Sequence, residues 1–124
     1  MIRNQRGFTL LEIIAVLVIL GILAAVAVPK YISLLEESRN SAAQAAIAEV
    51  KARASGYYGL FTLRNSAVPP PASVFGSVTA APDVGADYTV AAAQSGSNIL
   101  ITVSVVKGAT LSPSVVGTWY YPTP

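Results

Sequence analysis

The sequence lacks the two residue types on which most site chemistry depends. It contains no cysteine and no histidine among its 124 residues. Without cysteine there are no disulfides, thiolate nucleophiles or cysteine-ligated metals, and without histidine the commonest general base and metal ligand is missing. We therefore expect that the protein is not an enzyme and that it binds no cofactor.

Charged residues are also scarce. They make up 11% of the chain, whereas soluble domains average about 25%. The net charge is +2, and Arg3 and Arg6 supply both units, so no basic surface remains for nucleic acid as a primary ligand. Asp83 and Asp87 are too few for Ca²⁺, which takes about six or more oxygen ligands, and no metal site is predicted.

What the chain does have is one long apolar run. Residues 8–28 carry a single charge, Glu12, and would form a helix of about 31 Å, enough to cross a bilayer core of about 30 Å. Because Arg3 and Arg6 precede the run, residues 1–7 are predicted to stay in the cytoplasm while the rest of the chain lies across the membrane. A carboxylate at the centre of a membrane helix costs about 2.5–3.5 kcal/mol, and less near an interface, so Glu12 requires an explanation.

Three interpretations of this segment treat Glu12 differently. A secretory signal cut after Ala27, or a plain membrane anchor, leaves the carboxylate without a role. A cut between Gly7 and Phe8 supplies a partner, since it creates a cationic α-amino group on Phe8. In a bundle of such helices the Glu12 carboxylate of one subunit would meet the Phe8 amine of a neighbour, and the pairing would offset the burial of both charges.

The N-terminal stretch also resembles a known family. "RGFTLLEIIAVLVILGILAAVAVPKY" is similar to the start of type IV pilins and of the pseudopilins of type II secretion, over about residues 1–35. The resemblance implies that a prepilin peptidase cuts after Gly7 and methylates the Phe8 amine. It also implies that the apolar helix holds the subunit in the bacterial inner membrane until an assembly platform with an ATPase adds it to a helical homopolymer, with Glu12 guiding docking.

The helix is expected to continue beyond the apolar run. Pro29 removes one backbone hydrogen bond and Gly21 is a poor helix former, so the two residues predict a hinge. Residues 29–58 are amphipathic, and the helix is predicted to end at about Tyr58. Seven residues at helical spacing form the apolar stripe of this part: Ile32, Leu35, Ala43, Ala46, Ile47, Val50 and Ala54.

Residues 59–124, called the head below, are predicted to form a small β structure. The proline-rich residues 66–78 predict a loop. Strands are predicted at residues 87–93, 98–106 and 115–121. The second strand is expected to present one apolar face made of Ile99, Ile101, Val103 and Val105. The predicted fold class is α+β: a leader of residues 1–7 that is removed, then a long N-terminal helix, with a transmembrane or filament-core first half, packed on a short antiparallel sheet.

The chain ends with three aromatic residues, Trp119, Tyr120 and Tyr121. Two interpretations are open. The side chains form an exposed aromatic patch that binds a ligand, or they sit at the end of a strand and complete the small core, since aromatic residues supply much of the buried area in small domains.

These observations predict a structural subunit of a type IV pilus-like filament that serves adhesion, motility or DNA uptake. The subunit would contact membrane lipid before assembly and other copies of itself afterwards, in an extracellular pilus. Within the family, the alternative is a pseudopilin in a periplasmic filament of a type II secretion system. From another class, the alternative is a membrane-anchored ligand-binding module that uses the terminal aromatics and has no need of Glu12.

Overall fold

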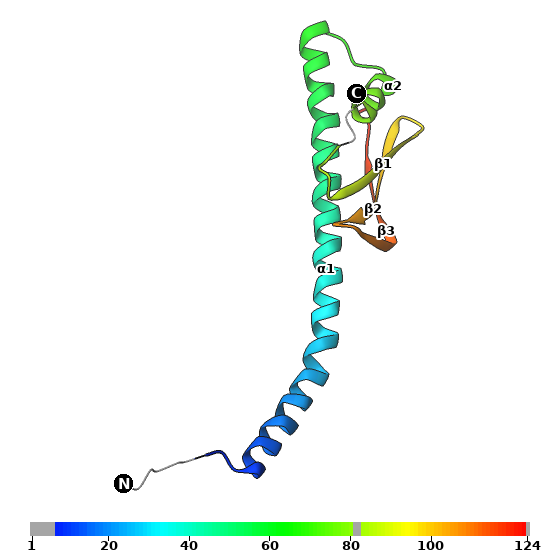
Figure 1. The fold of residues 1–124 in the computed structure, drawn as a ribbon. Helices are drawn as coiled ribbons and strands as arrows, with labels where there is room; N and C mark the ends of the chain where they lie inside the picture. The colour runs from blue at the N-terminus through cyan, green and yellow to red at the C-terminus, as the bar shows by residue number, and fades with distance from the viewer. Residues whose placement is uncertain (1–6, 81–82, 124) are drawn as a thin grey trace, which may run out of the picture. The chain divides into compact units, whose positions relative to one another are not determined.

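The fold is known from a computed structural model that describes residues 7–80 and 83–123. Its elements follow in the order α1 (Leu10–Asn65), α2 (Pro71–Thr79), β1 (Tyr88–Ser95), β2 (Asn98–Val106) and β3 (Ala109–Trp119) (Figure 1). The predicted α+β class, a long helix with a small antiparallel sheet, is confirmed. The chain divides into a first unit, Met1–Glu37, and a second unit, Ser38–Pro124, which are described separately.

The first unit consists mainly of the apolar part of α1. The most apolar stretch of 18 residues in this helix has a mean hydropathy of 3.0, and none of its residues is buried. This part is therefore long and apolar enough to cross a membrane. Both Gly21 and Pro29 lie inside α1, and the helix runs through them without interruption. The hinge at these residues stays a prediction.

The second unit contains the amphipathic part of α1, which is longer than predicted. The helix ends at Asn65, so the predicted end near Tyr58 is wrong. Gly56 and Gly59 lie within the helix. Each makes the helix about 1 kcal/mol less stable than alanine would, yet the helix continues to Asn65. The Asn65 side-chain amide donates a hydrogen bond of 3.0 Å to the Phe61 carbonyl and satisfies one of the last free carbonyls of α1.

The proline-rich segment contains a second helix, so the prediction of a loop at residues 66–78 is wrong for its second half. Pro70 is extended, with φ −62° and ψ 146°, and Pro71 opens α2. Proline is well tolerated in the first helical turn, because its missing N–H would have no partner there in any case. Val74 and Val78, one turn apart, are buried and hold α2 on the core.

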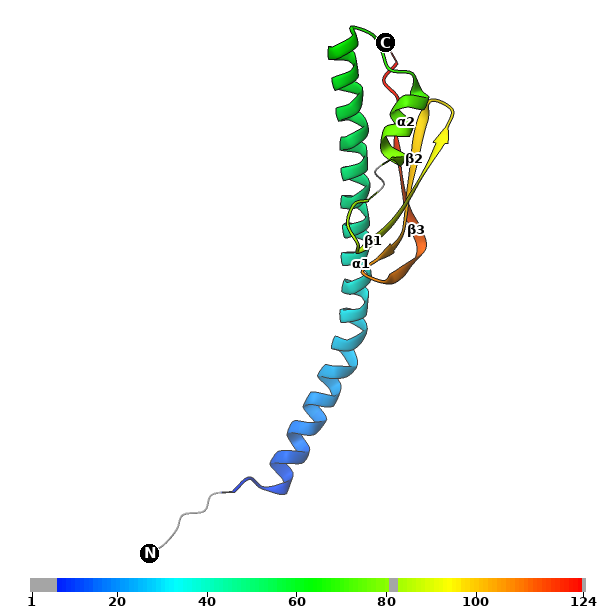
Figure 2. The same cartoon turned by 45° about the horizontal axis from the view of Figure 1, so that its top comes forward.

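The sheet has the order β1-β2-β3, with both neighbouring pairs antiparallel (Figure 2). The bounds of β2 agree with the prediction, and β1 begins and ends one or two residues later than predicted. The third strand was expected to start after Pro113, but β3 starts at Ala109 and runs through that proline. Pairing between β2 and β3 is irregular there, since the register shifts between Val103 and Val105.

A bulge also changes which side of β2 faces the core. Ile99, Ile101 and Val103 are buried as predicted, but the next buried residue is Val106 rather than Val105. The register between β1 and β2 shifts at the same place, because Thr89 pairs with Val105 while Val90 pairs with Val103. One extra residue on β2 reverses the alternation of side chains beyond it.

The head has no core without α1. Buried side chains of both helices and of the sheet form one cluster, which includes Ala43, Ala46, Ile47, Val50 and Ala54 of the predicted stripe. Ile32 and Leu35 of that stripe are not buried. Close approach of β3 to α1 depends on Gly117, where an added Cβ atom would lie 2.5 Å from Cγ2 of Ile47.

Candidate functional site

The N-terminus of α1 is closed by two reciprocal hydrogen bonds between Thr9 and Glu12. The Thr9 backbone N–H donates to Oε2 of Glu12 at 2.9 Å, and the Glu12 backbone N–H donates to Oγ1 of Thr9 at 3.3 Å. This is a capping box, in which the first helical turn satisfies its own free donors. The carboxylate of Glu12 is therefore engaged through one oxygen inside its own subunit.

Sequence reasoning missed this role of Glu12, although the signal is present. Thr-x-x-Glu directly before an apolar run is the pattern of a capping box. The carboxylate also lies in the first turn of the helix, where the positive end of the helix dipole favours it. Both effects lower the cost of placing an acid at the end of an apolar helix.

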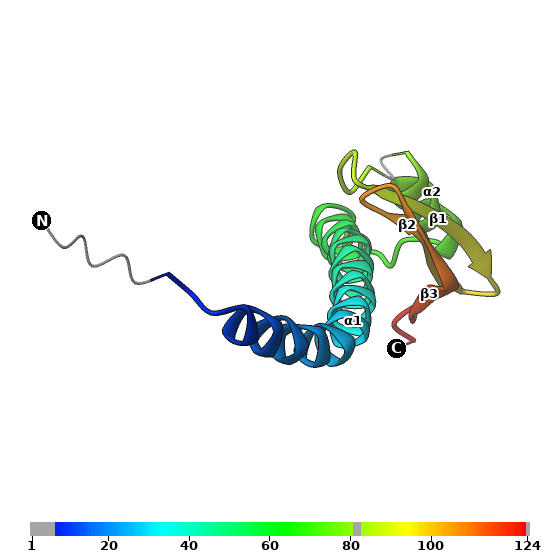
Figure 3. The same ribbon diagram turned by 60° about the horizontal axis from the view of Figure 1, so that its bottom comes forward.

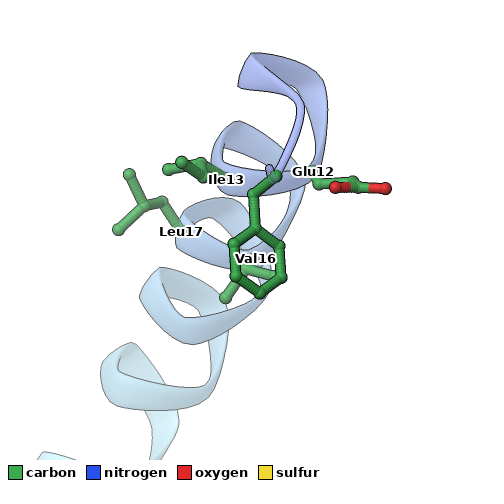
Figure 4. Close-up of a pocket in the computed structure, with 5 residues that line it drawn as sticks. Glu12, Ile13, Val16 and Leu17 are labelled. Carbon is green, nitrogen blue, oxygen red and sulfur yellow. The ribbon is translucent and has the colours of Figure 1, made fainter. Parts of the chain in front are cut away.

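Glu12 is the one polar member of an otherwise apolar groove on the first unit. The groove has a volume of about 440 Å³ and is lined by Phe8, Glu12, Ile13, Val16 and Leu17. Figure 4 shows that Glu12 points away from Ile13 and Leu17, so the carboxylate is presented at one side of the groove. A single acidic group thus lies next to an exposed apolar surface, and an apolar partner would be needed to shield that surface from water.

The two residues of the predicted cleavage site precede the helix. Gly7 and Phe8 lie outside α1, and 87% of the Phe8 surface is exposed. Among the described residues, apart from Gly7 itself and its chain neighbours, no atom lies within 4 Å of the position that a Cβ atom on Gly7 would take. Neither residue is covered by another described part of the chain. Arg3 and Arg6 of the predicted leader lie outside the described residues.

The structure separates the three terminal aromatics. Trp119 belongs to the core, with 6% of its surface exposed, and its Nε1–H donates to Oγ of Ser55 at 2.9 Å. Tyr120 is 73% exposed. Of the three residues predicted as a possible surface patch, Trp119 thus follows the core interpretation and Tyr120 lies at the surface.

Tyr121 joins the segment after β3 to the segment after α1. Its hydroxyl donates to the carbonyl of Pro69 at 2.6 Å, and its ring packs edge-on against Tyr58, with centroids 5.7 Å apart. Desolvation by the surrounding groups raises the pKa of the Tyr121 phenol, and the neighbouring Tyr58 hydroxyl raises it further. Tyr121 therefore has a structural role in the head.

Arg53 is the charged residue of the second unit with contacts both along α1 and to a loop. Arg53 Nε lies 3.1 Å from Oε1 of Glu49, one turn earlier on α1, and Arg53 Nη1 donates to the Asp83 carbonyl at 3.0 Å. Among the residues that the structure describes, no three acidic side chains come close enough to share a metal ion. Arg53 thus holds the loop before β1 against the helix.

Comparison with known proteins gives consistent similarities. Residues 2–28 match the family described as the prokaryotic N-terminal methylation motif. The chain is 31% identical to the type IV narrow pilus major component PilA5 of Thermus thermophilus over 86 residues, which cover 69% of this chain and 71% of that protein. It is 32% identical to the fimbrial protein EcpC of Eikenella corrodens over 119 residues, which cover 87% of this chain and 72% of that protein.

A type II secretion protein is also similar. The chain is 38% identical to the type II secretion system core protein G of Dickeya chrysanthemi over 80 residues, which cover 64% of this chain and 50% of that protein. The match therefore spans about half the length of that relative. No solved structure gives a significant match to the chain.

Proposed function

This chain belongs to the family of type IV pilins and type II secretion pseudopilins, and from this premise we propose that it is the structural subunit of a pilus-like filament. The observation that carries the proposal is the first unit: a helix segment with no buried residue and one carboxylate beside its apolar groove. Such a surface is stable only in lipid or against further copies of itself.

Processing of the leader prepares the surface for assembly. We propose that a prepilin peptidase cuts the bond between Gly7 and Phe8 and that the new Phe8 amine is methylated. The capping box uses the backbone N–H of Thr9, so the cut does not disturb it. Cleavage thus adds one cation next to a helix end that is already formed.

Docking then uses the carboxylate oxygen that the capping box leaves open. Oε2 of Glu12 accepts the hydrogen bond from Thr9, whereas Oε1 has no partner among the described residues. The Phe8 amine of a neighbouring copy would donate to Oε1, while Ile13, Val16 and Leu17 pack against the apolar face of that copy. The pair fixes the register of the subunits, because a buried charge without its partner is strongly unfavourable.

Before assembly the subunit would reside in the bacterial inner membrane with its N-terminus in the cytoplasm. The apolar length of α1 and the two arginines of the leader support this orientation. Extraction of so apolar a segment from lipid requires work, so we propose an assembly platform with an ATPase as a further partner.

The proposal is tested on the mature N-terminus and on cells. Mass spectrometry of the purified protein should find N-methylated Phe8 as the first residue. Electron microscopy of a deletion strain should show the loss of one class of filament, which the cloned chain restores. A mature protein that starts at Val28, or filaments that never contain this chain, would contradict the proposal.

A pseudopilin role is the second candidate, supported by the similarity to the secretion protein of Dickeya chrysanthemi. It predicts that deletion stops the export of a secreted protein while surface filaments persist. The pilus role predicts the reverse outcome. A membrane-anchored ligand-binding module has less support, because Trp119 is in the core and Tyr121 is bonded to Pro69.

A further inference from the structure

Three of the charged residues on the first part of α1 share one face of the helix. Lys30 follows Glu12 by 18 residues, or about five full turns, and Glu37 follows Lys30 by seven residues, which is about 20° short of two turns. Figure 3 shows this part of α1, from blue to cyan, as one continuous helix. The three side chains are therefore in line along it. Glu36 lies about 100° around the helix from Glu37.

Lys30 and Glu37 have no partner within the described part of their own chain. Both residues are exposed, and neither forms a hydrogen bond or an ion pair with another described residue. They are separated by about 10.5 Å along the helix, since each residue adds about 1.5 Å, whereas an ion pair brings its charged atoms within about 4 Å. The two opposite charges thus lie on the same face without meeting.

Docking determines what this face meets. In a bundle of parallel copies the face that carries Glu12 points inward, because the proposed partner of its carboxylate is the Phe8 amine of another copy. Lys30 and Glu37 then point inward as well. A charge enclosed among packed helices is strongly unfavourable unless an opposite charge lies close to it. Lys30 and Glu37 therefore each need a partner from another copy, as Glu12 does.

The spacing along α1 decides which charges come level when two copies dock. Phe8 and Thr9 precede the helix, so the Phe8 amine lies up to about 10 Å from Glu12 along the axis, at about 3.3 Å for each residue outside the helix and about 1.5 Å inside it. A copy that brings its amine level with Glu12 is displaced by this distance. The same displacement, in the same direction, brings its Lys30 level with Glu37 of the first copy.

From these observations we propose that Lys30 of one copy forms an ion pair with Glu37 of the neighbouring copy. The inference rests on the proposed filament and adds a second charge pair beyond the other end of the apolar run. Both pairs require the same axial displacement, so a copy that slips by one helical turn loses both pairs at once. Each copy uses Glu37 toward one neighbour and Lys30 toward the other, so the contact repeats without closing, as a helical filament requires.

Charge exchange in filaments of the full-length chain tests the pair. Lys30→Glu alone and Glu37→Lys alone bring like charges together at every contact, and each should lower filament yield at least tenfold. The double variant, Lys30→Glu with Glu37→Lys, again places opposite charges at every contact and should return the yield to within about twofold of the wild type. Quantitative immunoblotting of sheared filaments, with the membrane fraction as reference, measures all three variants.

Glu36→Lys is the matched control. It makes the same charge change as Glu37→Lys, one residue away and on a different side of the helix, and should lower the yield by less than about twofold. Combined with Lys30→Glu, it should not restore the yield, because the added lysine does not face residue 30 of the neighbouring copy.

Chemical cross-linking tests the contact directly. Carbodiimide joins a lysine amine to a carboxylate that touches it, so treated wild-type filaments should give a ladder of multimers on a gel. Mass spectrometry of the dimer band should find an amide between Lys30 and Glu37. At equal filament load, Glu37→Gln should remove the ladder and Glu36→Gln should keep it. A ladder that persists in Glu37→Gln, without that amide in the wild type, would contradict the pairing.

The outcomes separate this inference from the proposed function. Single variants that assemble like the wild type, or a double variant as defective as the single ones, overturn the ion pair and leave the filament subunit intact. Loss of Lys30→Glu from the membrane fraction also overturns it, because Lys30 would then serve to anchor the helix at the lipid surface. The absence of any filament from wild-type cells overturns the proposed function, and the ion pair with it.

Discussion

The two parts of α1 are built from similar apolar residues but satisfy them differently. In the first unit, side chains such as Ile22 and Leu23 are 63% and 60% exposed. In the second unit, Ile47 and Val50 of the same helix are 5% and 2% exposed, because the sheet and α2 cover them. The comparison teaches that one helix serves two kinds of partner. Its second part completes a core within the subunit, and its first part is left for partners outside it.

The largest effect is expected where the apolar run has its single charge. Glu12→Gln keeps an oxygen that can accept the hydrogen bond from Thr9, so the capping box survives while the charge is lost. Filament yield should fall by at least tenfold, a change of about 1.4 kcal/mol or more in assembly, while the subunit reaches the membrane in normal amounts. Quantitative immunoblotting of sheared filaments and of membranes measures both. Normal filament yield from the Glu12→Gln variant would show that register does not depend on the charge.

Matched truncations in the two units form the next test. Ile101→Ala removes a fully buried side chain and should lower the free energy of unfolding by about 2–5 kcal/mol. Ile22→Ala removes the same atoms from an exposed position and should change it by less than about 0.5 kcal/mol. Denaturant unfolding of the full chain in detergent, followed by Trp119 fluorescence, measures both.

Assembly into a filament should change the effect of Ile22→Ala. Once subunits have assembled, Ile22→Ala should lower the resistance of filaments to detergent or heat, because a neighbouring helix would then bury that side chain. If Ile22→Ala lowers the stability of the isolated subunit as much as Ile101→Ala does, then another part of the same subunit covers Ile22. That result would contradict the exposure of Ile22 in the structure.

A smaller effect is expected at the contact between β3 and α1. Gly117→Ala puts a Cβ atom 2.5 Å from Cγ2 of Ile47 and should destabilise the second unit by about 1–3 kcal/mol. Gly56→Ala adds a Cβ atom that meets no other part of the described chain within 4 Å, leaving aside the nearby helix backbone. It should instead stabilise the second unit by up to about 1 kcal/mol. Thermal unfolding by circular dichroism measures the pair, and Ile47→Ala should partly rescue Gly117→Ala. Equal effects of the two glycine substitutions would argue against a close approach at β3.

The smallest effect concerns pH. The pKa of the Tyr121 phenol is raised in the folded protein, so folding favours its neutral form. The neutral phenol therefore contributes its full stabilisation of the fold below the ordinary pKa of about 10. As the pH rises through the folded pKa, the phenolate can no longer donate to the Pro69 carbonyl, and this stabilisation is lost. Melting temperatures between pH 8 and about 11 should fall more steeply for the wild type than for Tyr121→Phe. Parallel curves for the two proteins would contradict the assignment.

The sequence allowed the broad plan of the molecule to be predicted. The apolar run is recognised by its length and lack of charge. The stripe from Ala43 to Ala54 follows helical periodicity and residues 98–103 alternate strictly, so local pattern and tertiary burial agree at these two places. The importance of Glu12 also followed from the sequence, because a single carboxylate in an apolar run is rare enough to require a role.

Other features depend on information that a local pattern does not contain. Helix α2 does not follow from the local pattern, because three consecutive prolines at residues 69–71 favour an extended backbone, whereas the last of them opens a helix. The burial of Val106 in place of Val105 depends on a bulge, and the pairing of two distant strands determines where that bulge lies. The capping box, by contrast, is predictable from the sequence, since Thr9 and Glu12 have the required spacing.

The continuity of α1 has a mechanical consequence. The helix is unbroken from Leu10 to Asn65, and the buried residues through which the sheet and α2 pack on it, Ala43 to Ala54, all lie in its second part. A force that pulls a head away from the base of a fibre is therefore carried along a single backbone, by hydrogen bonds arranged in series, before it reaches any interface. The turn around Pro29, which lacks one of these bonds, and the turn around Gly21, a poor helix former, should stretch first, and the head should keep its shape while the fibre lengthens.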